Sequence, residues 1–347
     1  MQYTNIYFST LKWYDKNKRD LPWRKSTDAY KIWLSETMLQ QTQVKTVIPF
    51  YNRWLKNYKS VYDVANADID VLLKEWEGLG YYSRCRNFHN ACKIVVEKHD
   101  GHIPDDYDVL ILLPGIGSYI ASAVLSIAYN KKLPAIDVNL KRVFCRMLGF
   151  KNYTKYNFNR IGNLAYKLTQ FDRPGDFNQA IMDIGSQICQ PRKPLCDYCP
   201  NKIYCKAYSS GRPHTYPVKV KNKKLLTKKM VAVLIMVKDK FLIEKRKENG
   251  LLGGLWELPS FEYHNQNQKS FKTLLHQRFN NKIKIKQKIG SAKHSYSHFK
   301  VDIDLYLCTS SVKMKYTKNS EWISFNEFKN YAFSKINHKL MQIVNND

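Results

Sequence analysis

The stretch Leu112-Leu113-Pro114-Gly115-Ile116-Gly117-Ser118-Tyr119 joins two segments whose apolar residues recur with the period of a helix. Pro114 and the two glycines interrupt that period, so the sequence predicts a helical hairpin over about residues 108–128. Gly115 and Gly117 let backbone N–H groups at the start of the second helix approach an anion closely, which suits a DNA phosphate. A turn that only connects two helices is the alternative, because a single Gly-x-Gly often does no more.

Around this hairpin, residues 1–208 read as helical, with Gly and Pro between the periodic segments rather than inside them. Residues 209–228 are polar and basic and contain Pro and Gly, which is typical of a linker. In residues 229–347 the apolar period changes to two. The elements expected there are strands at 230–237, 241–245 and 301–305 and helices at 267–279 and 325–344. We therefore expect a multi-domain chain, with an all-α domain followed by an α+β domain.

The chain carries 57 Lys and Arg against 29 Asp and Glu, a formal net charge of +28. A positive field of this size favours a polyanionic partner, usually a phosphate backbone. A general compositional bias toward Lys is the alternative cause. The longest apolar run, Val231–Val237, is too short to span a bilayer, and no secretory signal is recognisable. We therefore exclude the membrane and secreted classes and expect a reducing, cytoplasmic compartment.

Four of the eight cysteines fall in one short segment, with gaps of six, two and five residues between them. They are Cys189, Cys196, Cys199 and Cys205. Four thiolates this close in sequence can surround a metal, and a cytosolic chain needs no disulfide framework. Zinc ribbons usually pair two Cys-x2-Cys knuckles, whereas this segment has one, so the spacing favours an iron–sulfur cluster over zinc.

Glu36 lies among Ile32, Trp33 and Leu39 in a helical pattern, so it belongs to an apolar stripe rather than to the solvent face. Apolar surroundings raise the pKa of a carboxyl group, and Glu36 is therefore expected to be protonated. Asp137 directly precedes the helical run 138–148, where a helix cap is its simplest role. Backbone donors and the helix dipole would keep that carboxylate ionised. One neutral and one charged acid suit cleavage of a glycosidic bond.

The chain resembles the helix-hairpin-helix DNA glycosylase superfamily, and within it the adenine DNA glycosylases, over nearly its whole length. The matching segments are Leu21–Arg24, Ser35–Val44, Gly78–Arg84, the hairpin with Tyr119, Asp137, the run Met182–Gly185 before the cysteines, and Gly250–Pro259. The last of these resembles that family's Nudix-like module. The resemblance implies a 4Fe-4S cluster on the four cysteines and removal of adenine mispaired with 8-oxoguanine or G, at the start of base excision repair. It further implies a monomer that acts on duplex DNA, in the bacterial cytoplasm and associated with the nucleoid.

The resemblance also assigns roles to residues. Glu36 would protonate the adenine ring, while Asp137, Tyr119 and Asn139 would act on the sugar. The residues that match the adenine pocket are Arg19, Trp23, Leu39, Gln179 and Met182. Those that match DNA contacts are Arg24, Gln41, Thr42, Leu79, Tyr81, Gly115 and Gly117, with Gln41 and Tyr81 as wedges in the duplex. Tyr296, Ser297 and His298 match the motif that recognises 8-oxoguanine.

Two positions depart from the family pattern. Val138 stands where the family commonly has Gly, which affects how closely the backbone approaches DNA there. Tyr296 stands where Phe is usual, and an aromatic ring is retained.

Tyr119 occupies the position at which strand-cutting members of the superfamily carry a Lys. A phenol cannot form a Schiff base, so we expect a monofunctional glycosylase.

Three rival functions compete with this interpretation. An endonuclease III-like glycosylase/lyase for oxidised pyrimidines would share the helical domain, but the resemblance assigns the second domain to the adenine enzymes. A Nudix pyrophosphatase needs a Glu-rich helix that holds Mg²⁺, yet no Asp or Glu lies between Glu262 and Asp302. The third rival is a DNA-binding scaffold without catalysis. In such a protein Glu36→Gln would leave the behaviour toward DNA unchanged.

Overall fold

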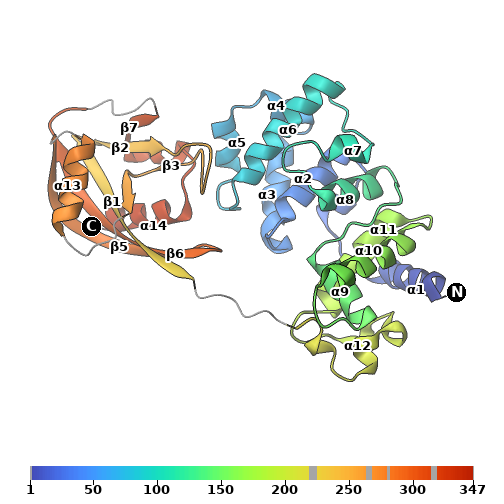
Figure 1. Cartoon of the computed structure of the whole chain (residues 1–347). Helices are drawn as coiled ribbons and strands as arrows, with labels where there is room; N and C mark the ends of the chain where they lie inside the picture. The colour runs from blue at the N-terminus through green and yellow to red at the C-terminus, as the bar shows by residue number, and fades with distance from the viewer. Residues whose placement is uncertain (1, 219–224, 263–267, 280–281, 314–318, 347) are drawn as a thin grey trace. The chain divides into compact units, whose positions relative to one another are not determined.

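A computed structural model describes residues 2–218, 225–262, 268–279, 282–313 and 319–346. The described chain divides into two compact units, Met1–Asn66 with Asn87–Lys221, and Ala67–Arg86 with Asn222–Asp347. Between residues 2 and 210 the structure has helices and no strand, whereas the described residues after 210 contain the strands together with helices α13 (Gln268–Phe279) and α14 (Lys335–Asn346) (Figure 1). The expected fold class, all-α followed by α+β, is therefore confirmed. None of the helices in the described part of the chain is both long and apolar enough to cross a membrane.

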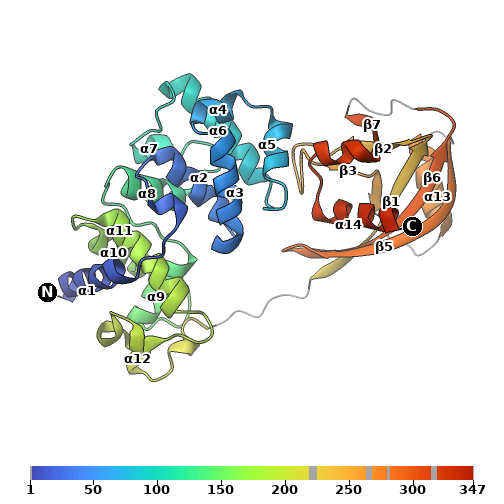
Figure 2. The ribbon, with the colours of Figure 1, turned by 180° about the vertical axis from the view of Figure 1, so that it is seen from behind.

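The first unit is built from helices that pack around apolar clusters. Its helices are α1 (Gln2–Asn17), α2 (Ala29–Leu39), α3 (Val44–Asn57), α4 (Val61–Asn66), α7 (Tyr107–Leu110), α8 (Ser118–Ala128), α9 (Val138–Leu148), α10 (Lys155–Thr169), α11 (Pro174–Asp183) and α12 (Lys206–Ser209). One cluster joins α1, α9, α10 and α11, and α10 and α11 lie side by side in both views (Figures 1 and 2). Leu140, Val143, Phe144 and Met147, which recur at helical spacing on α9, are buried in that cluster.

The hairpin has the predicted form, with a first helix, α7, of a single turn. Gly115 has a φ of +80°, and a Cβ there would lie 2.8 Å from Asn87 Cβ. A residue other than glycine would therefore meet both backbone strain and a clash. Gly117 is the N-cap of α8 and has no side chain that could accept from the first N–H groups of the helix, which suits the binding of an anion there.

The second unit contains a mixed seven-stranded sheet with the order β3-β2-β1-β6-β5, where β4 pairs with β1 and β7 with β2. Its strands are β1 (Leu226–Val237), β2 (Lys240–Lys245), β3 (Trp256–Glu257), β4 (Ser260–Glu262), β5 (Ile283–Ser295), β6 (Phe299–Ser310) and β7 (Ser320–Ser324). The strands expected at 230–237 and 241–245 lie in β1 and β2, which form a tight hairpin with Val237 opposite Lys240. Strands β1 and β6 are parallel, and the other pairs are antiparallel.

Apolar residues alternate between the two faces of this sheet and form one cluster on each. Helix α13 (Gln268–Phe279) packs on one face through Phe271, Leu275 and Phe279. Helix α14 (Lys335–Asn346) packs on the other through Ile336, Leu340 and Met341. The unit also includes α5 (Ile69–Glu75) and the beginning of α6 (Ser83–His99), which continues into the first unit.

The helix expected at 325–344 is interrupted in the structure. A 3₁₀ turn covers Phe325–Asn330, and α14 begins only at Lys335. Between them, Phe333 forms a parallel bridge with Trp256 and stacks on Phe328 with a centroid separation of 4.1 Å. The prediction of one continuous helix was therefore wrong, because burying Phe333 against the sheet requires extended backbone.

Candidate functional site

Glu36 is buried in the middle of α2, with only 5% of its surface exposed. Helix α2 begins after Asp28, whose side chain accepts hydrogen bonds from the N–H groups of Tyr30 and Lys31. Every residue from Ile32 to Met38 is buried. Burial raises the pKa of Glu36 to about 7, as the apolar pattern predicted, and a hydrogen bond from Tyr119 works in the opposite direction. The carboxyl group is therefore well placed to carry a proton near neutral pH.

Tyr119, the second residue of α8, reaches the same carboxyl group. Its hydroxyl donates to Glu36 Oε2 at 2.5 Å and lies 3.8 Å from Met182 Sδ. Burial and the nearby carboxylates raise the pKa of Tyr119 well above its ordinary value, so the phenol remains a donor. Because Oε2 accepts this hydrogen bond, Oε1 is the oxygen of Glu36 that is left to carry an acidic proton.

Asp137 is the N-cap of α9. Its Oδ1 accepts from the N–H of Leu140 at 2.6 Å, and its Oδ2 accepts from Asn139 Nδ2 at 2.8 Å. We expected these donors to dominate its ionisation. Instead, burial is the largest influence and raises the pKa of Asp137, while the hydrogen bonds and the charge of Arg142 lower it. The negative charge of Asp137 also raises the pKa of Glu36, so the two carboxyl groups lie within electrostatic reach of each other.

A hydrogen-bonded chain of side chains leads away from Asp137. Asn139 donates to Asp137 and accepts from Arg142 Nη2 at 2.9 Å. Arg142 also donates to the carbonyl oxygens of Gly185 at 2.7 Å and Cys189 at 2.8 Å. The start of the cysteine segment is thus connected to the side chain that fixes Asp137. Arg142 was not among the predicted site residues, although its position one turn after Asn139 on a helix could have indicated it.

Two of the matched arginines meet at a carboxylate that the sequence analysis did not single out. Asp183 is fully buried and accepts from Arg19 Nε at 2.5 Å and from Arg24 at 2.6 and 3.0 Å. The side chain of Arg24 is only 9% exposed, which leaves little of it for the DNA contact expected from the resemblance. Its role in the structure is to neutralise Asp183 next to Met182. The sequence could have indicated this buried ion pair, because Asp183 lies between two apolar residues, Ile181 and Ile184, on one helical segment.

The remaining residues matched to the adenine pocket surround this region on three elements. Trp23 is buried in a 3₁₀ turn with its ring edge toward Tyr51. Leu39 ends α2, and Gln179 and Met182 lie on α11; all three are half-buried. Met182 reaches Tyr119, so α2, α8 and α11 converge at Glu36.

Both residues matched to duplex wedges are exposed and have a left-handed backbone. Gln41 has a φ of +58° and Tyr81 a φ of +50°, values that are uncommon for residues other than glycine. Such strain is characteristic of functional segments. Thr42 follows Gln41 and is half-buried, whereas Leu79 is buried before Tyr81.

Tyr296, Ser297 and His298 form the turn between β5 and β6. The ring of Tyr296 packs between His294 and Phe299, and burial raises its pKa to about 12. Ser297 and His298 are exposed at the tip. Within the second unit, Ser297 Oγ lies 2.7 Å from the hydroxyl of Tyr81, so the structure brings a predicted wedge residue to the predicted recognition motif.

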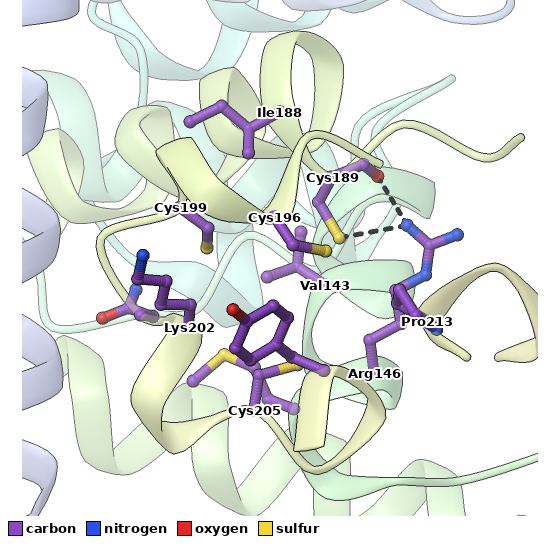
Figure 3. A pocket seen from close by; sticks show the side chains of 12 residues that line it. Val143, Arg146, Ile188, Cys189, Cys196, Cys199, Lys202, Cys205 and Pro213 are labelled. Carbon is purple, nitrogen blue, oxygen red and sulfur yellow. Dashed lines mark hydrogen bonds between the residues drawn. The ribbon is translucent and has the colours of Figure 1, made fainter. Parts of the chain in front are cut away.

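The four clustered cysteines line one pocket of the first unit, as Figure 3 shows. All four are free thiols, and a π-helical turn, Ile184–Ile188, leads into Cys189. The buried guanidinium of Arg146 donates to Cys189 Sγ at 3.2 Å and to three carbonyl oxygens of residues 189–191. Among the described residues, no three His, Cys, Asp or Glu side chains are arranged closely enough to hold a metal ion. The donor set is nevertheless suited to an iron–sulfur cluster, because four thiols face one pocket.

Comparison with known proteins gives consistent matches to DNA glycosylases. Residues 34–163 match the family model of the HhH-GPD superfamily of base excision DNA repair proteins, and residues 230–342 match the NUDIX domain. An adenine DNA glycosylase of Rattus norvegicus is 32% identical over 96% of this chain and 76% of its own length. One from Buchnera aphidicola is 36% identical over 89% of this chain and 88% of its own length. The solved structure of a thermostable thymine-DNA glycosylase matches 60% of this chain and 97% of its own, with a TM-score of 0.56 and 28% identity.

Proposed function

The chain belongs to the adenine DNA glycosylase family, and we propose that it removes adenine mispaired with 8-oxoguanine or G from duplex DNA, leaving an intact abasic site. The observation that carries this proposal is the buried Glu36 carboxyl, with a pKa raised to about 7 and a hydrogen bond from Tyr119, within electrostatic reach of Asp137. DNA is the substrate of the family, and the adenine would be flipped out of the helix to reach these buried groups.

Glu36 acts as the general acid. Its Oε1 gives a proton to a ring nitrogen of the adenine, and the electron pair of the glycosidic bond leaves with the neutral base. The Tyr119 hydroxyl holds Oε2 at 2.5 Å, so it fixes which oxygen faces the base and stabilises the carboxylate that forms.

Asp137 acts on the sugar, which becomes cationic as the base leaves. Its carboxylate stabilises that charge, directly or through a transient ester, before water adds to the anomeric carbon. Asn139 and the N–H of Leu140 hold the two oxygens of Asp137 in place. The product is an abasic site with the strand uncut, because Tyr119 offers no amine for a Schiff base.

Cys189, Cys196, Cys199 and Cys205 would hold a 4Fe-4S cluster. When bound, this group would cross-link a loop whose exposed Arg192 and Lys193 suit DNA phosphates, so we assign it a structural task. Arg146 and Arg142 would then keep Cys189 in position.

We assign recognition of 8-oxoguanine to Tyr296, Ser297 and His298 in the β5–β6 turn. Ser297→Ala should reduce the preference for 8-oxoguanine over G opposite adenine, with the release of adenine opposite G nearly unchanged. The matched control is Ser295→Ala, an exposed serine two residues earlier on the same hairpin. Equal ratios in both variants would remove Ser297 from the motif.

The deciding experiment measures single-turnover release of the base from duplexes that carry A opposite 8-oxoguanine, G, C or T. We expect release to be fastest opposite 8-oxoguanine and slower opposite G. An endonuclease III-like function is the alternative, since the helical fold is shared with an endonuclease III–DNA complex at 20% identity and a TM-score of 0.53. Release of oxidised pyrimidines together with strand cleavage would establish that alternative.

A further inference from the structure

The outer face of α10 presents aromatic and cationic side chains in one row. Tyr156, Arg160, Asn163 and Lys167 follow one another at steps of four, three and four residues, so they share a face of the helix. All four are exposed, and Tyr156 is 66% exposed. Tyr166, at 56% exposed, flanks the row on the same helix.

This row is not explained by the packing of the helix. Helix α10 lies beside α1, α9 and α11 (Figure 2), and it contributes Ile161, Leu164 and Leu168 to their common core. The apolar side of the helix is therefore already satisfied by the fold. The large rings on the opposite side lie outside that core and add exposed apolar surface, which is a feature of binding surfaces.

The charge of this region has one sign. Residues 138–171 contain seven Lys and Arg and no Asp or Glu. Arg142 and Arg146 form hydrogen bonds to Cys189 within the first unit, whereas Lys155, Arg160 and Lys167 are exposed. The surface is thus complementary to a polyanion.

The cations and rings are interleaved rather than separated. The Arg160 guanidinium lies 5.9 Å from the centre of the Tyr156 ring and donates to its hydroxyl at 3.2 Å. Lys167 Nζ lies 5.0 Å from the centre of the Tyr3 ring on α1. Each cation therefore stands where a phosphate could be bound next to a base stacked on the neighbouring ring.

We propose that this surface, the α10 face (Tyr3, Tyr156, Arg160, Tyr166 and Lys167), binds single-stranded nucleic acid without sequence preference. Unpaired bases have free faces for stacking on tyrosine rings, whereas the bases of a duplex are stacked on one another. Tyr156 and Tyr166 are about 15 Å apart along the helix, long enough for a few nucleotides. This binding is separate from Glu36 and Asp137 and does not depend on the proposed adenine excision.

The test measures the binding of a short fluorescent oligothymidylate to the full-length chain by anisotropy at low salt. Saturating unlabelled mismatch duplex is added so that the glycosylase site is occupied. The variant Tyr156→Ala with Tyr166→Ala should weaken oligothymidylate binding by at least about tenfold, since the two stacking rings together contribute this much or more. Tyr156→Phe with Tyr166→Phe keeps both rings and should bind like the wild type.

A charge-matched pair of variants separates the local effect from the net charge. Arg160→Ala with Lys167→Ala should weaken binding markedly more than Lys93→Ala with Lys98→Ala, two exposed lysines on α6. Single-turnover base release from a short duplex should be the same in all variants.

Three results would overturn the proposal. The mismatch duplex could displace the oligothymidylate completely from the wild type, which would leave no separate surface. The alanine variant could bind the oligothymidylate as tightly as the wild type, which would leave the α10 face to a protein partner. It could also lose duplex binding and base release in parallel, which would make the face an extension of the glycosylase site.

Discussion

Replacing Glu36 by Gln should make the protein inactive and, at neutral or higher pH, more stable. The pKa of Glu36 is raised from 4.5 to about 7 by burial, so the folded protein keeps a proton that the unfolded chain loses. Between these two pH values the free energy of unfolding therefore falls as the pH rises, by about 3 kcal/mol in total. The stability that depends on this proton is complete below pH 4.5 and is lost as the pH passes through about 7. Glutamine has no proton to lose and avoids this penalty.

The assay compares urea unfolding of the wild type and Glu36→Gln at a series of pH values from about 4.5 to 8, so that all other titrating groups cancel. The difference in unfolding free energy should shift in favour of the variant by about 3 kcal/mol across that range. Single-turnover adenine release should fall by about 10²- to 10⁴-fold, with duplex binding within a few-fold of the wild type. Wild-type release should decline above pH 7, where Glu36 is ionised.

Glu97→Gln is the matched control, because Glu97 is exposed on α6 of the same unit. It should change neither the pH profile of stability nor the rate of base release. A pH-independent difference between the wild type and Glu36→Gln would refute the buried, protonated acid. Base release by Glu36→Gln at the wild-type rate would refute its catalytic role.

Asp137→Asn should lose most adenine release with little change in melting temperature, because asparagine caps helices as well as aspartate does; a lower melting temperature with normal release would leave only the cap. Purified protein should contain iron and sulfide, and Cys199→Ser should lower both; one zinc and no iron would contradict the cluster. Borohydride should trap little wild-type protein on DNA on the timescale of base release, whereas Tyr119→Lys should be trapped markedly more. If the wild type is trapped strongly and Tyr119→Phe is trapped equally, the amine that forms the Schiff base must belong to a lysine elsewhere in the chain.

The sequence was sufficient where a local pattern determines the environment of a residue. Glu36 stands among apolar residues at helical spacing, and this alone predicted both its burial and the direction of its pKa shift. The cap at Asp137 and the hairpin at Pro114–Gly117 were likewise predictable, because capping and turn formation involve neighbours in the sequence.

Where residues far apart in the chain meet, the sequence was not sufficient. The hydrogen bond between Tyr119 and Glu36 joins positions 83 residues apart, and the ion pairs of Asp183 reach back 159 and 164 residues. The same limit explains the wrong prediction at 325–344, since the break depends on Trp256 of a distant strand. It also explains the wrong expectation for the pKa of Asp137. Burial by residues distant in the sequence raises this pKa more than the local hydrogen-bond donors lower it.

The helix cap at Asp137 and its proposed action on the sugar are therefore not alternatives. The hydrogen bond that caps α9 is the one that holds Oδ1, and Asn139 holds Oδ2 from the same first turn. A carboxylate fixed in this way does not have to reorient when a positive charge develops next to it. The free-energy cost of reorganisation is therefore small, and this preorganisation is what makes electrostatic stabilisation effective. Because Arg142 joins Asn139 to the carbonyl oxygen of Cys189, the orientation of Asp137 depends on the start of the cysteine segment. Loss of order in that segment should thus reduce base release.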